Sequence, residues 1–182
     1  MTGTHALLFD GALAIVVLFA AICDLRTRRI PNWLTVSGVL VGLAINVWSS
    51  GWSGTLASSA GMGLAMLVYL PLFAIRALGA GDVKLMAAVG AIAGPFPWFC
   101  IFVATCLVGG LLALALVISK RRLVQTLFNT LRIAQALLKG RNPANQEPEM
   151  DFRNPCAVTL PHGLSIALAA LLTIALGHMH LI

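Results

Sequence analysis

Long apolar runs separated by short polar stretches dominate the sequence. The runs cover residues 6–23, 33–48, 55–75, 98–119 and 157–177. A membrane helix needs about 20 mostly apolar residues, so each run predicts one membrane-spanning helix. Proline suits the first turn of a helix and disfavours helix at the residue before it. Pro31 therefore marks the start of the second run, and the Ser/Gly-rich residues 49–54 predict the turn that ends it.

A further helix is predicted from length alone. Only nine apolar residues, 85–93, precede the turn expected at residues 94–97, and nine residues are too few to cross a bilayer. The helix must therefore begin near residues 77–81, which puts Asp82 and Lys84 in its first turns. With this helix the pattern predicts an all-α, polytopic membrane protein with six transmembrane helices.

Residues 120–139 have a different pattern, with apolar side chains on one face of a helix and polar side chains on the other. The apolar positions are Leu123, Val124, Leu127, Phe128, Leu131, Ala134 and Leu138. Six Lys and Arg and no acid fall within residues 120–141. This segment predicts an amphipathic interfacial helix on an anionic cytoplasmic leaflet, followed by a polar loop to residue 156. A calmodulin- or nucleic-acid-binding helix has a similar pattern, but the position between two spans favours lipid. We expect residues 1–182 to form one integral-membrane domain.

Composition agrees with a membrane protein, since 59% of residues are hydrophobic and 10% are charged, against about 25% charged in soluble domains. The net charge of +6 raises the question of nucleic acid. With six spans, however, all 12 Lys and Arg fall on one side of the membrane. By the positive-inside rule that side is cytoplasmic and both termini are outside. We therefore expect no nucleic-acid partner.

The cysteines and the N-terminus exclude several other classes. The four cysteines form no Cys-x-x-Cys pair, so we expect no metal site, no disulfide framework and no cofactor. The first residues lack the basic segment of a secretory signal peptide, and no cleavage site follows the first run. The sequence indicates no oligomeric state.

Two acids share the predicted cytoplasmic boundary, because Asp24 ends the first span and Asp82 begins the fourth. Asp10 lies on the other side, and Lys84 points to nearly the opposite helix face from Asp82. Two carboxylates that meet in a partly dehydrated site share one proton. The ionised one can then take a proton from water while the neutral one donates to a carbonyl oxygen. From spacing alone, three interpretations of the pair remain open: an aspartic peptidase, structural charges or a transport pathway.

Three short motifs resemble those of the type IV prepilin peptidases, which are GxGD membrane aspartic peptidases. The motifs are Asp24-Leu-Arg-Thr-Arg-Arg-Ile-Pro31-Asn32, Gly79-Ala-Gly81-Asp82-Val-Lys84 and Pro161-His162-Gly163. The second matches the family's GxGDxK motif. In the third, the family often has an aromatic residue between proline and glycine, so His162 departs from the pattern.

The resemblance implies a membrane aspartic endopeptidase of the bacterial inner membrane, with Asp24 and Asp82 as the catalytic pair and no metal. Such enzymes cut the short basic leader of prepilins or pseudopilins at the cytoplasmic face, after a glycine and before an apolar helix. The resemblance gives supporting roles to Gly79, Gly81, Lys84, Pro31 and Asn32, and makes Pro161, His162 and Gly163 candidate site-lining residues.

Long members of that family carry an N-terminal cytoplasmic domain with paired Cys-x-x-Cys motifs, associated with N-methylation of the trimmed pilin. This sequence contains no such domain and is similar to the short form of Flp (tight-adherence) pilus systems. We therefore expect no methyltransferase activity. The archaeal preflagellin peptidases are also similar.

Two alternatives remain open from the sequence. Another GxGD intramembrane protease, of the presenilin or signal-peptide-peptidase kind, would have Tyr-Asp on the first catalytic helix and Pro-Ala-Leu on a later one. Here Cys23 precedes Asp24, and His162 follows Pro161. A small proton-coupled transporter or a pilus-assembly scaffold would also retain intramembrane acids. A proton relay favours acids at several depths, whereas these two share one boundary.

Overall fold

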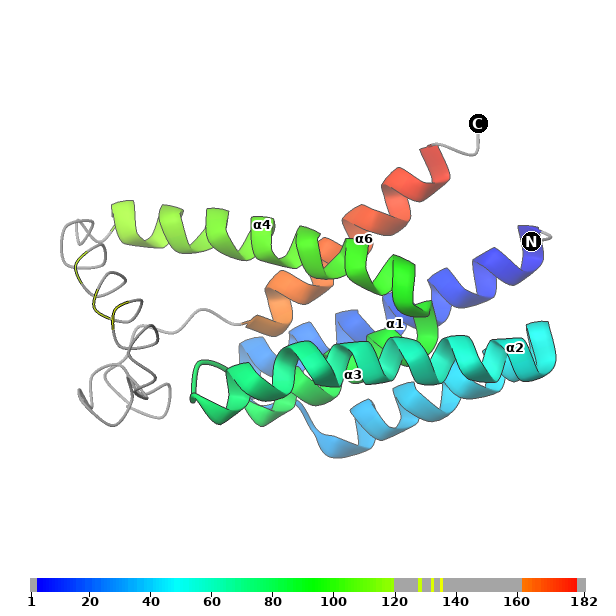
Figure 1. The fold of residues 1–182 in the computed structure, drawn as a ribbon. Helices are drawn as coiled ribbons and strands as arrows, with labels where there is room; N and C mark the ends of the chain where they lie inside the picture. The colour runs from blue at the N-terminus through cyan, green and yellow to red at the C-terminus, as the bar shows by residue number, and fades with distance from the viewer. Residues whose placement is uncertain (1–2, 120–127, 129–131, 133–134, 136–161, 180–182) are drawn as a thin grey trace.

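The computed structural model describes residues 3–119, 128, 132, 135 and 162–179. Its elements are α1 (Gly3–Thr27), α2 (Asn32–Ala74), α3 (Ala80–Ala93), α4 (Pro95–Ser119) and α6 (His162–Met179) (Figure 1). No strand occurs in these ranges, so the all-α prediction is confirmed for the described part of the chain.

The long helix α2 consists of two arms that join at Gly51. This residue has φ 56° and ψ −127°, a backbone conformation that glycine adopts without a steric penalty. Figure 1 shows the chain reversing here so that the arms run side by side. A Cβ atom at Gly54 would overlap the backbone carbonyl of Asn46 on the other arm. The turn predicted at residues 49–54 is therefore present, with one non-helical residue.

Three helices in the described ranges are long and apolar enough to cross a membrane, namely Ala6–Thr27, Asn32–Ala74 and Pro95–Ser119. The prediction of six membrane spans is not supported. Helix α3 has 14 residues and, at about 1.5 Å per residue, is roughly 21 Å long, less than the ~30 Å hydrocarbon core. The apolar part of α6, His162–Gly177, is also shorter than these three helices.

Helix α3 is the centre of the bundle. Every residue from Leu85 to Ile92 is buried, and a helix that is apolar all round belongs in an interior. It packs most extensively on α2 and also contacts α1, α4 and α6. Gly61 of α2 and Gly90 of α3 make the closest contact, since a Cβ atom on either would overlap the backbone of the other. These contacts hold the short helix in place.

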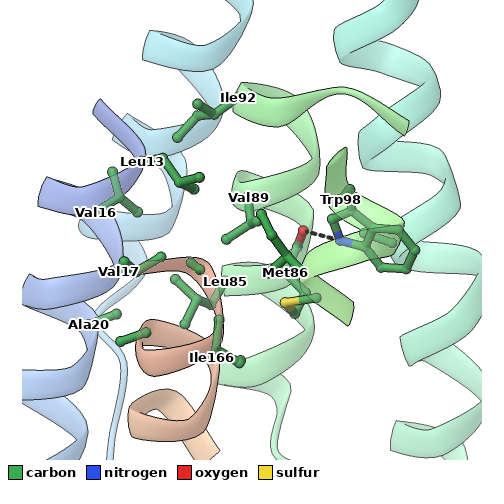
Figure 2. Close-up of a cluster of buried hydrophobic side chains, with 14 of the residues drawn as sticks. Leu13, Val16, Val17, Ala20, Leu85, Met86, Val89, Ile92, Trp98 and Ile166 are labelled. Atoms are coloured by element: carbon green, nitrogen blue, oxygen red, sulfur yellow. Dashed lines mark hydrogen bonds between the residues drawn. The ribbon is translucent and has the colours of Figure 1, made fainter. Parts of the chain in front are cut away.

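Apolar side chains of α3 pack against apolar side chains of α1, α4 and α6 (Figure 2). The labelled side chains are Leu13, Val16, Val17, Ala20, Leu85, Met86, Val89, Ile92, Trp98 and Ile166. The indole nitrogen of Trp98 donates a hydrogen bond of 3.1 Å to the Met86 carbonyl, so its polar atom is satisfied in the core. The outer faces of the long helices also carry large apolar groups, with Trp48 85% exposed and Leu111 68% exposed. An outer surface of this kind suits contact with lipid.

Five basic residues lie at one end of the bundle, in the helix ends and loops where α1 ends, α2 begins and ends, and α3 begins (Figure 1). They are Arg26, Arg28, Arg29, Arg76 and Lys84. The start of α1 and the end of α6 lie at the opposite end (Figure 1). We call the end of the bundle that carries these five basic residues the basic end. Apart from residues 128, 132 and 135, the predicted interfacial helix and its loop at 120–156 lie outside the described residues.

Candidate active site

Asp24 and Asp82 are both buried at the basic end. Asp24 lies in the last turns of α1 and is 8% exposed, while Asp82 lies in the first turn of α3 and is 7% exposed. The charge of Asp24 acts on Asp82, and α1 and α3 are in contact. Two acids 58 positions apart in the sequence are thus neighbours in the fold, as the sequence analysis predicted.

Helix α6 orients the carboxylate of Asp24. The backbone N–H of Gly163, in the first turn of α6, donates a hydrogen bond of 2.9 Å to Oδ2 of Asp24. The first N–H groups of a helix have no partner within the helix, and the helix dipole favours negative charge there. A Cβ atom at Gly163 would lie 3.0 Å from that same oxygen. A glycine at this position therefore lets the carboxylate reach the helix end.

The carboxylate of Asp82 is oriented by the residue that caps its own helix, α3. The N–H of Gly79, which caps α3, donates to Oδ2 of Asp82 at 3.3 Å. Asp82 lies outside the three segments long enough to cross a membrane. Burial, and then the charge of Asp24, raise the pKa of Asp82 from 3.8 to about 6, while the Gly79 hydrogen bond opposes the change. Asp82 therefore keeps a proton more readily than an exposed aspartate does.

The motif that contains Asp24 and the motif that contains Asp82 contact each other through their neighbouring residues. Pro31 caps α2 with φ −69°. The ammonium group of Lys84 donates a hydrogen bond of 2.9 Å to the side-chain oxygen of Asn32, so the lysine points away from Asp82, as its spacing predicts. A Cβ atom at Gly81 would lie 3.3 Å from the side chain of Ile30. The start of α3 thus packs closely against the loop that follows α1.

His162 is the first residue of α6, it is half-buried, and it interacts electrostatically with Asp24. Its ring centre lies 6.4 Å from that of Tyr69. Burial lowers the pKa of His162, and the charge of Asp24 opposes this change. Its Nε2 atom is buried with no hydrogen-bond partner among the described residues. Pro161, the remaining predicted site-lining residue, lies outside the described residues.

Tyr69 is a site-lining residue that the sequence analysis missed. It is 2% exposed, interacts electrostatically with Asp82, and packs edge-on against the rings of Trp98 and Phe102. It is the one tyrosine in the sequence and lies within an apolar run. A buried tyrosine hydroxyl usually has a polar partner. The single tyrosine within an apolar run could therefore have identified Tyr69 as a candidate site residue from the sequence.

No group of three or more His, Cys, Asp or Glu in the described ranges could hold a metal ion.

The observations define a helical membrane protein with two buried acids from separate helices at its basic end. A sequence model of the type IV leader peptidase family matches residues 11–114. That range is more than half of the 182 residues, and the chain belongs to this family. The matched range includes Asp24 and Asp82 but not α6. No curated protein and no solved structure matches the chain.

Proposed function

We propose that this protein is an aspartic endopeptidase that removes the short basic leader of prepilins or pseudopilins. The observation that carries the proposal is the burial of Asp24 and Asp82 together at the basic end, each on its own helix. Membership of a leader peptidase family favours peptide cleavage over the transporter and scaffold interpretations. It also favours a prepilin precursor over the substrates of other GxGD proteases.

In the proposed mechanism the two acids share one proton. Asp24, held by the Gly163 amide, takes a proton from the attacking water, while neutral Asp82 donates its proton to the carbonyl oxygen of the scissile peptide. The water oxygen bonds to the carbonyl carbon to give a tetrahedral gem-diol. The C–N bond then breaks, the leaving nitrogen takes a proton from Asp24, and Asp82 recovers its proton as the new carboxyl group forms.

We place the basic end at the cytoplasmic face of the bacterial inner membrane, because the side of a membrane protein rich in Lys and Arg faces the cytoplasm. The start of α1 and the end of α6 then face the outside. This orientation puts the two acids on the side where a prepilin leader is presented. The amphipathic helix expected at residues 120–139 would lie along the same leaflet and the loop to residue 156 would be on the same side, within a single domain spanning residues 1–182.

The resemblance further implies a cut after a glycine and before the apolar helix of the precursor, and a substrate of the Flp pilus type. The sequence contains no Cys-x-x-Cys pair. The proposed activity therefore does not include N-methylation of the trimmed pilin.

The test is leader cleavage of a co-expressed precursor that has a basic leader, a glycine at the cut and a long apolar helix. Asp24→Asn and Asp82→Asn each remove one member of the pair, and we expect each to slow cleavage by roughly 10²–10⁴-fold. Asp10→Asn is the matched control, because it makes the same change on α1 away from the basic end. Membrane insertion of all variants is checked by fractionation. Normal cleavage by either of the first two variants would overturn the proposal.

A further inference from the structure

A groove of about 410 Å³ opens between the two arms of α2 and helix α3. It lies on a different side of α3 from the two acids. Lys84 and Asp82 are two positions apart, so they project to nearly opposite faces of that helix. Asp82 is buried whereas Lys84 is exposed and lines the groove. A molecule in this groove would therefore lie away from the catalytic pair.

The groove is polar at one end and apolar along its length. Its polar groups are Asn32, Thr35 and Lys84, and they come from the first turns of α2 and α3, which both begin at the basic end. Deeper positions are apolar, and Leu40 lies about 12 Å further along α2 than Asn32 at 1.5 Å per residue. Met62 and Met66 form part of the wall, and methionine adapts its shape to flexible chains.

The charge at the polar end calls for an anion. In the described part of the chain, the ammonium group of Lys84 donates to the side-chain oxygen of Asn32, which orients the lysine but carries no charge to neutralise it. Asn32 is exposed and lines the groove, and its side-chain amide nitrogen is a second hydrogen-bond donor beside the lysine. A phosphate group accepts hydrogen bonds from both kinds of donor, and the anionic lipids of the cytoplasmic leaflet supply phosphate at this depth.

We propose that this groove binds one anionic phospholipid, with its phosphate at Lys84 and Asn32 and one acyl chain along the methionine wall. Charge complementarity favours this occupant over a zwitterionic lipid, and the apolar length favours it over free phosphate. A bound lipid would bridge the starts of α2 and α3, which carry Asn32 of the first acidic motif and Lys84 of the second. The proposal does not depend on which peptide the protein cuts.

The experiment uses the full-length protein in micelles of a neutral detergent, titrated with phosphatidylglycerol and read by native mass spectrometry and by melting temperature. We expect one lipid to bind with higher affinity than any others and to raise the melting temperature. Phosphatidylcholine with the same chains should bind about tenfold more weakly, and inorganic phosphate should give no protection. Equal binding of the two lipids, or full protection by phosphate alone, would overturn the proposal.

Two pairs of variants separate the charge from the groove. Lys84→Gln should weaken phosphatidylglycerol binding about tenfold, whereas Arg26→Gln, which removes a cation of the basic end outside the groove, should not. Met66→Trp fills the groove without changing charge and should also prevent binding. Leu67→Trp is its control, because Leu67 is the adjacent residue, is 72% exposed and does not line the groove. Equal losses within either pair would contradict the assignment, and the second pair decides the question if Lys84→Gln does not fold.

Discussion

The backbone N–H of Gly163 donates a hydrogen bond to Oδ2 of Asp24 at 2.9 Å, and the two residues are 139 positions apart in the sequence. The contact joins the first turn of α6 to the last turns of α1. The family match ends at residue 114, so a residue beyond the matched segment orients one of the two proposed catalytic acids. Helix α6 is therefore part of the site as well as of the bundle.

Gly163→Ala tests this contact. The added methyl group would lie 3.0 Å from Oδ2 and 3.1 Å from Cβ of Asp24, so the aspartate or the helix end must move. Hydrogen bonds to charged groups contribute about 1.5–3 kcal/mol, so we expect kcat to fall roughly 10–100-fold. Gly177→Ala is the control on the same helix, since a Cβ atom there meets nothing within 4 Å. Equal kcat values for the two variants would mean that the contact does not position Asp24 for catalysis.

His162 gives a second prediction, based on its buried Nε2 atom without a partner among the described residues. An unsatisfied buried polar group costs about 1–3 kcal/mol of stability, which a precursor could offset by hydrogen-bonding to this nitrogen. His162→Phe keeps an aromatic ring and removes the polar atom. We expect the variant to unfold at a higher temperature and to show a higher KM for the precursor. Thermal unfolding and cleavage kinetics measure the two effects.

His162→Gln is the companion variant, because its amide can still hydrogen-bond to the substrate. It should keep a KM closer to that of the unchanged protein than His162→Phe does. If His162→Phe is stabilised and cleaves with an unchanged KM, the histidine serves only in packing beside Tyr69.

The sequence predicted the helices better than it predicted the membrane spans. The expected turns are present, since Gly94 separates α3 from α4 and Gly51 divides α2 into its two arms. The number of full-length spans was not predictable, because hydrophobicity alone does not separate a helix that faces lipid from one buried inside protein. Helix α3 is apolar and buried from Leu85 to Ile92, and neighbouring helices take the place that lipid would occupy around a longer span.

The sequence also predicted that Asp24 and Asp82 would be neighbours, because the expected alternation of the helices put both on one side of the membrane. It could not predict the residues that complete the site. Tyr69 interacts electrostatically with Asp82 only because α2 folds back at Gly51, and no local pattern specifies how the returning arm packs against α3. Gly163 was identified through a motif, whereas its hydrogen bond to Asp24 depends on where α6 docks on α1.

The pH dependence of cleavage tests the role given to Asp82. Burial, followed by the charge of Asp24, raises its pKa to about 6. Below that pH the group holds the proton it must donate, and above it the neutral form declines about tenfold per pH unit. We therefore expect kcat/KM, measured in lipid nanodiscs from roughly pH 4 to pH 8, to fall on the basic side with an apparent pKa near 6. Asp10→Asn should leave that fall unchanged. A rate that stays constant up to the top of the range would contradict Asp82 as the proton donor, even if both acids are essential.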